Sequence, residues 1–336
     1  MDITNPQSAT AAPHGEAWRT LGDALRQVAR VFLQSSNWRL QAADVAAEQR
    51  RAQVEAELLL CALTDKSRSQ LFLSLTEPWQ SVWQSPLQQA IQRRLQGEPL
   101  QYITGRAAFY GRDFIVRQGC LIPRPETEVL VQAASDWLRQ RQGLGTVLDL
   151  GTGSGVLAVT LALEYPQCCV YAVDNSVDTV DIACENIHLH VADVQGIWAD
   201  GLELLADLAT DGNQTWPQVC PQPGRLRLAK PSLLVSNPPY IASAELATLQ
   251  SEVVAYEPRG ALDGGTDGLF YYRRLAAIGA NMFQPGSAGL LLEVGAGQAQ
   301  QVIDLFVAGE QRWLNWRFTV LPDLRGMERV VFGIRP

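Results

Sequence analysis

The sequence predicts an α/β protein in which a Rossmann-like, doubly wound sheet follows a small all-helical domain and a β-hairpin linker. Three observations predict it. Up to about residue 104, apolar residues recur at helical spacing, and between residues 105 and 120 the spacing changes to that of short strands. From residue 146 onward, strands and helices alternate in the β-α-β order that is typical of a mostly parallel sheet with helices on both faces.

The composition is that of an ordinary globular protein. The 336 residues suffice for about two domains, and 47% hydrophobic with 18% charged residues allows a sizeable core. A formal net charge of −8 argues against a protein that binds nucleic acid by itself, because phosphate binding needs a basic face. The six cysteines form no Cys-x-x-Cys pair and no ligand-like spacing with the three histidines. We therefore expect reduced thiols and no metal site.

No targeting or membrane segment is predicted. The chain begins without the basic residues and apolar run of a secretory signal. Its longest uncharged stretch, 275–292, is interrupted by polar residues, proline and glycine, so it should not span a membrane. We expect a cytoplasmic protein.

The amino-terminal region is predicted to consist of a mobile tail, residues 1–15, and a helical domain, residues 16–104. A Thr20 cap precedes the first helix. The apolar face of this helix consists of Leu21, Leu25, Val28 and Phe32. A second helix is indicated by Val54, Leu58, Ala62 and Leu63. A third starts at Ser85-Pro86 and ends before Gly97. Nothing here looks catalytic, so we interpret the domain as a packing or recognition module.

Residues 105–125 are predicted to form a β-hairpin linker, because two aromatic-containing runs flank Gly111-Arg112-Asp113. The domain that follows, residues 126–336, begins with an amphipathic helix. The apolar face of that helix consists of Val129, Leu130, Ala133, Ala134, Trp137 and Leu138. Strands are expected at 146–150, 169–173, before residue 200, and at 233–236, 289–294 and 329–334. The proline-punctuated stretch 211–231 is predicted to be a surface loop.

A glycine-rich turn, Gly151-Thr152-Gly153-Ser154-Gly155, lies between the strand 146–150 and an apolar helix. Such a turn lets the backbone bend sharply and approach a ligand closely. Its spacing differs from the dinucleotide fingerprint, which would need its third glycine at position 156. Asp174 closes the next strand, where a carboxylate can accept from both hydroxyls of a ribose, and Asp200 follows the third strand, where it can accept from an adenine amino group. These residues predict a site for a nucleoside-containing cofactor.

The tetrapeptide Asn237-Pro238-Pro239-Tyr240 follows the strand 233–236 and indicates the chemistry. The two prolines make the backbone stiff and extended. The side-chain oxygen of Asn237 and the carbonyl oxygen of Pro238 can then accept the two hydrogens of a substrate –NH2 group. Tyr240 supplies an aromatic face or a hydroxyl that holds the flat acceptor group. We assign all four residues to catalysis and substrate binding, and Asn237 also to the cofactor site.

The predicted chemistry is methyl transfer from S-adenosylmethionine to an amide or amino nitrogen. An amide nitrogen is a poor nucleophile because its lone pair is delocalised, a resonance that gives peptide C–N rotation a barrier of roughly 18–20 kcal/mol. No side chain is basic enough to deprotonate it, so orientation of the amide is the remaining means of catalysis. The positive sulfur of the donor already activates the methyl group, so neither a metal nor a covalent nucleophile is needed.

Several segments make the chain resemble the bacterial release factor glutamine methyltransferases, also called HemK-like proteins. The main ones are Glu98–Gly105, Leu121–Glu128, Asp149–Gly155 and Asn237–Tyr240. Weaker matches are 55–61 with 66–68, Tyr256-Glu257-Pro258, 262–265, Glu293, Asp323, Gly326 and Arg329. The resemblance covers residue 16 to the end. It implies a seven-stranded class I methyltransferase sheet whose last strand is antiparallel.

The resemblance also implies an activity, namely methylation of the side-chain amide nitrogen of the glutamine in the Gly-Gly-Gln loop of class-1 peptide release factors. This reaction supports translation termination. By the same resemblance, Gly151–Gly155 and Asp174 would bind S-adenosylmethionine, Asn237–Tyr240 would hold the glutamine, and the helical domain would dock the release factor. We expect class-1 release factors as partners, and no direct contact with nucleic acid or membrane.

Two departures and three alternatives remain. The stretch 211–231 is longer than is usual in the family, and Gly201 stands where the family often has an aromatic residue beside the adenine. The Asn-Pro-Pro-Tyr motif is shared with adenine methyltransferases that act on DNA or RNA, so it fixes the chemistry and not the substrate. Ribosomal-protein glutamine methyltransferases are related, but they usually depart from Pro-Arg-Pro-Glu-Thr-Glu. An idle binding module is the third alternative, which the intact Asn237 and glycine turn oppose.

Overall fold

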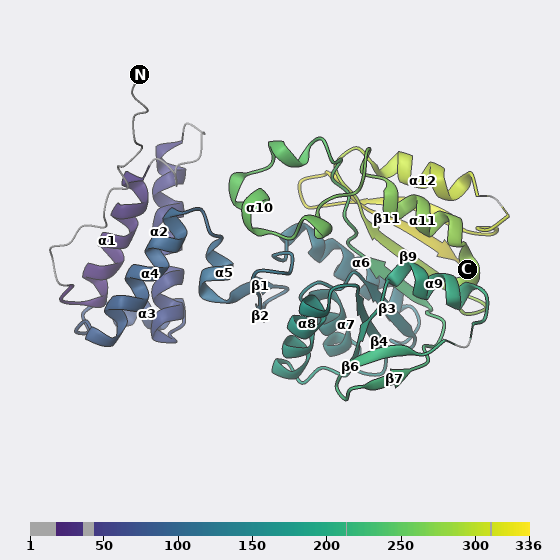
Figure 1. The fold of residues 1–336 in the computed structure, drawn as a ribbon, viewed down its shortest axis with the longest axis horizontal. Coiled ribbons are helices and arrows are strands. Elements are labelled where there is room, and N and C mark those ends of the chain that lie inside the picture. Colours follow the sequence, from purple (N-terminus) through teal and green to yellow (C-terminus); the bar gives the residue numbers. More distant parts are fainter. Residues whose placement is uncertain (1–17, 36–43, 213, 310) are drawn as a thin grey trace, which may run out of the picture. The chain divides into compact units, whose positions relative to one another are not determined.

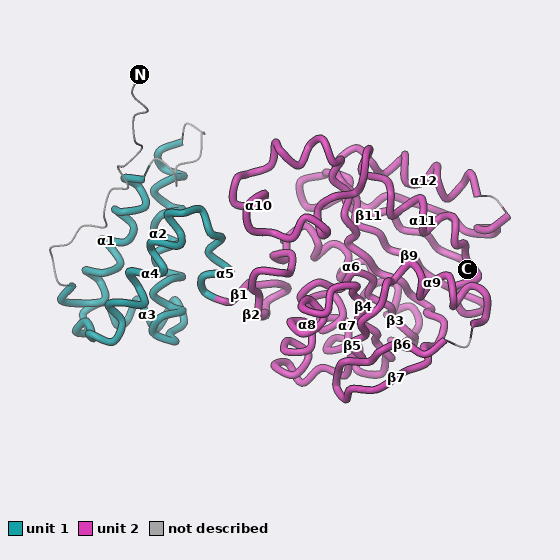
Figure 2. The backbone as a smooth tube through the Cα atoms, in the orientation of Figure 1, with its two compact units in different colours: residues 1–104 teal, residues 105–336 magenta. Residues whose placement is uncertain are grey.

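The computed structural model describes residues 18–35, 44–212, 214–309 and 311–336, and the chain divides into two compact units, 1–104 and 105–336 (Figure 2). The tail predicted for residues 1–15 lies outside the described residues. None of the described helices is both long enough and apolar enough to cross a membrane.

The first unit is helical (Figure 1). Its helices are α1 (Leu21–Gln34), α2 (Val45–Thr64), α3 (Arg68–Leu73), α4 (Gln84–Leu95) and α5 (Leu100–Thr104). The hydroxyl of Thr20 accepts a hydrogen bond from the Asp23 amide, and the Asp23 carboxylate accepts one from the Thr20 amide, both at 3.1 Å. This capping box fixes the start of α1, and the predicted apolar face of α1 is buried. The cap and the face are therefore confirmed.

The predicted second helix is confirmed as α2, but its buried face differs from the set of residues that indicated it. Val54 and Leu58 of α2 are each 38% exposed, whereas the inward side of the helix carries Ala52, Glu55, Ala56, Glu57, Leu59 and Leu60. Glu55 pairs with Arg94 of α4, whose Nε donates to Glu55 Oε2 at 2.7 Å. The buried face of α2 therefore includes an ion pair, and the spacing of the apolar residues does not indicate that face.

The predicted hairpin is present at the start of the second unit, where β1 (Arg106–Phe109) pairs antiparallel with β2 (Arg112–Ile115). Tyr110 and Gly111 at its turn have φ values of 48° and 73°, as a two-residue type I′ turn requires. The Glu128 carboxylate accepts from the Tyr110 amide at 2.8 Å, and the Asn186 side chain bonds both backbone groups of Ile115. These bonds attach the hairpin to the α/β layers.

Within the described part of the second unit, nine strands form one sheet in the order β10-β11-β9-β8-β3-β4-β5-β6-β7 (Figure 1). The strands are β3 (Thr146–Leu150), β4 (Cys169–Asp174), β5 (Val194–Trp198), β6 (Trp216–Cys220), β7 (Gly224–Leu226), β8 (Leu233–Ser236), β9 (Ala288–Glu293), β10 (Arg317–Pro322) and β11 (Glu328–Arg335). β11 runs antiparallel to both β9 and β10, so the expected antiparallel last strand is confirmed. The expected number of seven strands is wrong, because β6 and β7 extend the sheet beyond β5.

The stretch 211–231, predicted to be a loop, contains the β6–β7 hairpin. Trp216 and Cys220 at the ends of β6 are buried and anchor it to the sheet. Prolines weaken the strand signal, but Pro221 and Pro223 lie in the turn between the two strands, and Pro217 lies outside the β6 residues that pair with β5. The β6–β7 hairpin forms because β6 pairs with β5 and buries its end residues against the sheet. The local sequence of the hairpin does not show this contact.

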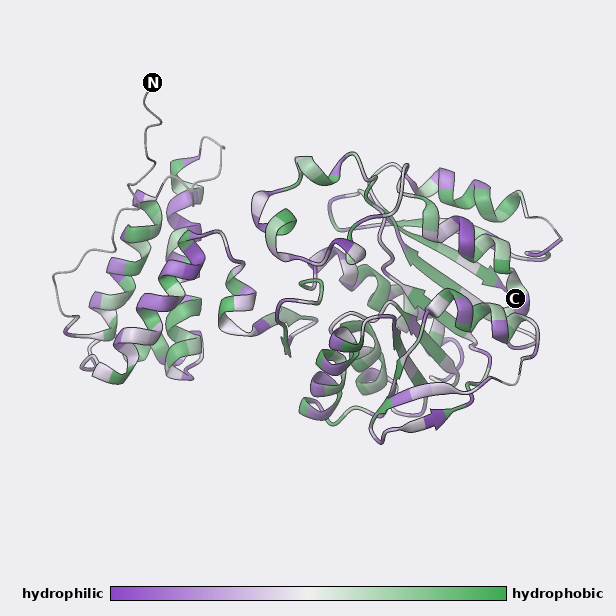
Figure 3. Cartoon of the chain, in the orientation of Figure 1, coloured by the Kyte–Doolittle hydropathy of each residue, from purple (hydrophilic) through white to green (hydrophobic). Residues whose placement is uncertain are grey.

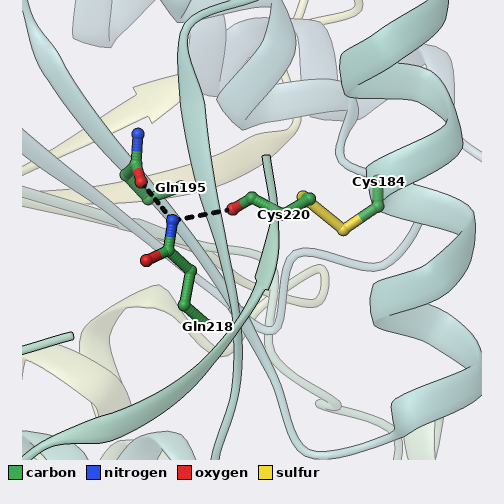
Figure 4. The surroundings of a disulfide bond; sticks show 4 residues. All are labelled: Cys184, Gln195, Gln218 and Cys220. Atoms are coloured by element: carbon green, nitrogen blue, oxygen red, sulfur yellow. Dashed lines mark hydrogen bonds between the residues drawn. A yellow bond between two sulfur atoms is a disulfide. The ribbon is translucent and has the colours of Figure 1, made fainter. Parts of the chain in front are cut away.

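Cys184 of α8 (Val177–Leu189) and Cys220 of β6 form a disulfide, with their Cα atoms 5.9 Å apart (Figure 4). This corrects the expectation that all six cysteines are reduced. The two residues are 36 positions apart, and only the packing of α8 beside the sheet brings them together, so no spacing motif indicates the pair. Among the described residues, no group of three or more His, Cys, Asp or Glu side chains could hold a metal ion.

Helices cover both faces of the sheet. One layer consists of α6 (Glu128–Arg139), α7 (Val156–Glu164) and α8 (Val177–Leu189), and the other of α9 (Gly201–Ala209), α11 (Phe270–Ile278) and α12 (Ala299–Val307). In β3, Val147 packs into the first layer and Leu148 into the second. The central strands are largely apolar (green in Figure 3), as a sheet buried on both faces requires. The doubly wound α/β architecture is confirmed.

Candidate active site

The two sequence motifs lie at the ends of adjacent strands. β3 has β4 as its neighbour on one side and β8 on the other. The order of the strands along the chain therefore reverses between β3 and β8. Loops that leave neighbouring carboxyl ends at such a point open a crevice. The glycine turn leaves β3 and the tetrapeptide leaves β8, and the Ser236 hydroxyl joins these strand ends by donating to the Leu150 carbonyl at 2.6 Å. The fold therefore brings both motifs to one crevice.

A cavity of about 440 Å³ lies at this edge of the sheet, within the size range of small-molecule sites. The sequence-predicted site residues on its wall are Gly151, Thr152, Gly153, Ser154, Asp174, Asp200, Asn237, Pro238 and Pro239. Gly155 and Tyr240 are not among the lining residues. The cavity thus collects most of both predicted sites, and the two remaining residues lie behind its wall.

The three glycines of the turn differ in what surrounds them. All have positive φ, at 72°, 58° and 82° for Gly151, Gly153 and Gly155. A Cβ added at Gly151 or Gly153 would meet nothing within 4 Å, whereas one at Gly155 would lie 3.3 Å from Ala183 Cβ in α8. Gly151 and Gly153 therefore leave open space beside the backbone for a ligand. Gly155 instead permits α7 to pack closely on α8.

Asp149 supports the turn from inside the protein. It is fully buried, and its Oδ2 accepts from the Thr152 hydroxyl at 2.6 Å and from the Ala158 amide at 3.1 Å. The second bond satisfies an amide of the first turn of α7, whose N-cap, Gly155, has no side chain. Burial raises the pKa of Asp149 to about 7. Its role is to hold the turn, and it does not line the cavity.

Two carboxylates face the cavity from neighbouring strand ends. Asp174 Oδ2 accepts from the Gly153 amide and Oδ1 from the Ser176 amide, both at 3.1 Å. Burial raises the pKa of Asp174 above its usual value. Asp200 is the N-cap of α9, and both amides that it caps donate to Oδ1, at 2.9 and 3.1 Å. Its Oδ2 is left for a donor in the cavity.

An aromatic surface enters this part of the cavity from α11. A Cβ at Gly201 would lie 2.1 Å from Leu150 Cδ1, so the wall closes tightly at this position. The aromatic residues that line the cavity are Phe270 and Tyr271. The pKa of Tyr271 is raised first by burial and then by the charge of Asp200 and two other carboxylates. Sequence reasoning missed these residues because no motif marks α11.

The tetrapeptide presents two open acceptors. The Asn237 Nδ2 donates to the Thr127 hydroxyl oxygen at 3.2 Å. Among the described residues, no hydrogen bond reaches Asn237 Oδ1 or the Pro238 carbonyl oxygen. A Cβ at Gly264 would lie 2.8 Å from the Pro239 carbonyl oxygen, so the tetrapeptide is tightly backed. Its two open oxygens are held on a loop with little room to move.

Tyr240 packs against the core. Its carbonyl oxygen accepts from Gln298 Nε2 at 2.9 Å. Burial, followed by the negative charge of Glu293, raises the pKa of Tyr240 to about 12. Glu293 ends β9 and is itself buried, which raises the pKa of its carboxyl to about 7.

The segment Leu121–Glu128 forms part of the cavity rim. Arg124 pairs with the buried Glu257, which also accepts from the Ile122 amide at 3.3 Å. Arg124 and Pro258 both line the cavity, so this ion pair joins two segments that border it. Sequence reasoning noticed both segments as motifs but assigned no role to Arg124, Thr127 or Glu257.

The comparisons with known proteins agree with this geometry. Residues 37–105 match the family described as the PrmC N-terminal domain, and residues 126–212 match the methyltransferase small domain. The release factor glutamine methyltransferase of Koribacter versatilis (strain Ellin345) is 38% identical over 291 residues, which are 87% of this chain and 94% of that protein. The protein of the same name from Geobacter sulfurreducens is 38% identical over 282 residues, which are 84% of this chain and 89% of that protein.

A solved structure is also similar, the protein-(glutamine-N5) methyltransferase (release factor-specific) from Alicyclobacillus acidocaldarius. It is 34% identical, and the match covers 66% of this chain and 99% of that chain with a TM-score of 0.39.

Proposed function

Because the chain belongs to the release factor glutamine methyltransferase family, we propose that it methylates the side-chain amide nitrogen of the glutamine in the Gly-Gly-Gln motif of class-1 peptide release factors. The methyl donor is S-adenosylmethionine. The observation that carries the proposal is a single crevice in which an open glycine turn meets the two open acceptor oxygens of Asn237 and Pro238. The reaction supports translation termination, and we place the protein in the cytoplasm with release factors as partners and no direct contact with nucleic acid.

The cavity fits S-adenosylmethionine. Gly151 and Gly153 leave room beside the backbone, and the Asp174 carboxylate, which lines the cavity, would accept from the ribose hydroxyls. Asp200 and Tyr271 border the same end of the cavity and suit the adenine base. When bound, the cofactor supplies a methyl group that its positive sulfur has already activated. The residues of this chain therefore have only to bind and orient.

Orientation of the acceptor amide falls to the tetrapeptide. Asn237 Oδ1 and the Pro238 carbonyl accept the two hydrogens of the glutamine –NH2 group, which directs the nitrogen lone pair toward the cofactor side of the cavity. Orientation of this kind can contribute about 7–11 kcal/mol to a reaction. Tyr240 and Pro239 keep the loop in place. The tight backing of the loop by Gly264 suits this task, because small displacements of an orienting group reduce catalysis strongly.

The decisive test is transfer of a labelled methyl group to a purified class-1 release factor, with duplex DNA and a ribosomal protein as rival acceptors. We expect label only on the release factor, and mass spectrometry should locate one added methylene unit on the Gly-Gly-Gln glutamine. A release factor whose motif glutamine is changed to glutamate is the matched control and should take up no label. Label found only in DNA or in the ribosomal protein would overturn the substrate assignment and leave the cofactor assignment intact.

A further inference from the structure

The loop of residues 241–261 follows the tetrapeptide directly and has no apolar core of its own. It contains the short helix α10 (Ser251–Tyr256) and two 3-10 turns, none of which has a buried residue. Its ends are held together, since the Ile241 amide donates to the Leu262 carbonyl oxygen at 3.0 Å. The structure describes the whole loop, and Glu257 is the one buried residue in it. A segment that buries so little apolar surface opens easily unless a polar contact holds it.

Glu257 supplies such a contact to the rim segment 122–124. The Arg124 Nη2 donates to Glu257 Oε1, and the Ile122 amide donates to Oε2 at 3.3 Å. The side chain of Glu257 is only 1% exposed, whereas that of Arg124 is 33% exposed. A carboxylate this buried is costly unless it is paired, and here both of its oxygens are paired. Glu257 is therefore the anchor by which the 241–261 loop is attached to the rim.

The anchor lies near the tetrapeptide. Arg124 is followed by the 3-10 turn Pro125–Thr127, whose last residue accepts from Asn237 Nδ2 at 3.2 Å. One short segment thus contacts both Glu257 in the loop and Asn237 in the tetrapeptide. Glu257 itself does not line the cavity. The residues next to it in the loop that do are Pro258, Gly260 and Ala261.

These lining residues give the cavity an uncharged wall with short side chains. A Cβ at Gly260 would meet nothing within 4 Å, and the φ of Gly260 is not positive, so the local backbone does not require glycine. Open space beside a backbone lets another backbone approach closely. In the proposed substrate, two glycines precede the glutamine, so the chain that carries the acceptor amide is itself bare at these positions. The wall and the Gly-Gly segment are therefore complementary in shape.

We propose that the 241–261 loop is the surface on which the Gly-Gly segment of the release factor rests, and that Glu257 is a positioning residue that holds this surface in place through Arg124. The inference rests on the proposed function. The glycine turn and Asp174 are held by bonds of their own, which do not involve the loop. Loss of the anchor should therefore affect recognition of the release factor much more than binding of the cofactor.

Glu257→Gln tests the anchor in the full chain. It keeps the shape but places an –NH2 group against one of the two donors. We expect the amides of the 241–261 loop to exchange with deuterium at least about 10-fold faster, as for loss of a hydrogen bond to a charged group. KM for the release factor should rise by a similar factor, while calorimetric affinity for S-adenosylhomocysteine stays within a factor of about two. Glu245→Gln, at an exposed glutamate of the same loop, is the matched control and should change none of these values.

Gly260→Leu tests the surface and leaves the ion pair intact. Because the added side chain starts in open space, the variant should fold with the wild-type Tm and the wild-type exchange of the loop. The leucine would occupy the place of the substrate backbone, so KM for the release factor should rise about 10-fold or more with little change in affinity for S-adenosylhomocysteine. Gly224→Leu is the control, since a Cβ at Gly224 also meets nothing within 4 Å and Gly224 does not line the cavity.

Three results would overturn the inference. Unchanged exchange in Glu257→Gln would mean that the loop does not depend on this anchor. A wild-type KM in Gly260→Leu would mean that the release factor does not rest on the loop, and a loss of S-adenosylhomocysteine affinity in that variant would place the loop over the cofactor. A wild-type protein that transfers no methyl group to the release factor would instead overturn the proposed function, and with it the role of the loop in recognition. The exchange measurement would still decide whether Glu257 anchors the loop.

Discussion

At the residue scale, Asn237 is the first side chain to change. Asn237→Ala removes one of the two oxygens that we propose accept from the substrate amide, but it leaves the glycine turn and Asp174 intact. We expect turnover to fall by at least about 100-fold, as when one preorganised group is removed from other active sites. Affinity for S-adenosylhomocysteine, measured by calorimetry, should stay within a factor of about two. Asn281→Ala, an exposed asparagine away from the cavity, is the control, and equal losses of binding and turnover in Asn237→Ala would argue against the assignment.

Asp174→Ala should show the opposite pattern. The Asp174 carboxylate accepts from the Gly153 amide and faces the cavity. Its loss should weaken S-adenosylhomocysteine binding roughly 10- to 100-fold, the range for hydrogen bonds to a charged group, while kcat at saturating cofactor changes little. Asp193→Ala, an exposed aspartate that precedes β5, is the matched control. An unchanged dissociation constant in Asp174→Ala would mean that another group holds the ribose.

Which residues could be foreseen depended on how local their signals are. Gly151, Gly153, Asp174 and Asn237 stand in short motifs, and all of them line the cavity. Thr127 and Arg124 bind partners that lie 110 and 133 positions further along the chain, and nothing within a few residues of either reveals the partner. Gly155 and Tyr240 belong to the motifs, but they face Ala183 and the buried Glu293. A motif thus identifies the loop, and the tertiary fold decides which of its residues meet the ligand.

At the scale of elements, the start of α9 limits the end of the cavity that we propose for the adenine base. A Cβ at Gly201 would lie 2.1 Å from Leu150 Cδ1, so Gly201→Ala must displace the Leu150 side chain, and a tryptophan there must displace more. We expect Gly201→Ala to weaken S-adenosylhomocysteine binding by a few-fold, and Gly201→Trp by considerably more. Gly224→Ala is the control, because a Cβ there meets nothing within 4 Å and no positive φ is involved. Tighter binding by Gly201→Trp would show that the wall yields and that an aromatic residue fits there.

The β6–β7 hairpin gives a second prediction at this scale. The Cys184–Cys220 disulfide closes a loop of 36 positions between α8 and β6, and a crosslink of this length typically stabilises a fold by about 2–4 kcal/mol. A reductant should therefore lower the Tm of the oxidised protein by roughly 4–15 °C for a unit of this size. Cys184→Ser should lose that response, whereas Cys169→Ser, at an exposed free cysteine, should keep it. Equal Tm values with and without reductant in the wild type would mean that the thiols are reduced at the outset.

Elements with strong apolar periodicity were predictable, and those stabilised by their neighbours were not. β3 and β8 have the predicted bounds because short buried strands are continuous apolar runs. The β6–β7 hairpin was missed because its prolines suppress the local signal, while its stability comes from pairing with β5. The buried face of α2 did not follow from the apolar residues that indicated the helix, because that face includes the buried Glu55–Arg94 pair. In both cases the missing information lies in another element.

At the scale of the whole molecule, the pH dependence of stability should report the buried Glu293. This carboxyl lies at the end of β9. The charged or titratable groups near it from other segments are Glu126, Tyr240, Tyr272 and Arg329. Burial is the main reason why its pKa rises from 4.5 to about 7. Between these two pH values the folded protein holds a proton that the unfolded chain releases. The free energy of unfolding therefore falls as pH rises through this window.

Glu293→Gln removes that titration and isolates its contribution. Between pH 5 and pH 8 the wild type should lose up to about 2–3 kcal/mol from this one group, at about 1.4 kcal/mol for each unit of pKa difference. The variant loses none of it, so its Tm relative to the wild type should be higher at pH 8 than at pH 5. Glu328→Gln, at an exposed glutamate of β11, should show no such change. A constant Tm difference between Glu293→Gln and the wild type at both pH values would mean that the carboxyl titrates alike in the folded and unfolded chains, and that it is not desolvated as the fold requires.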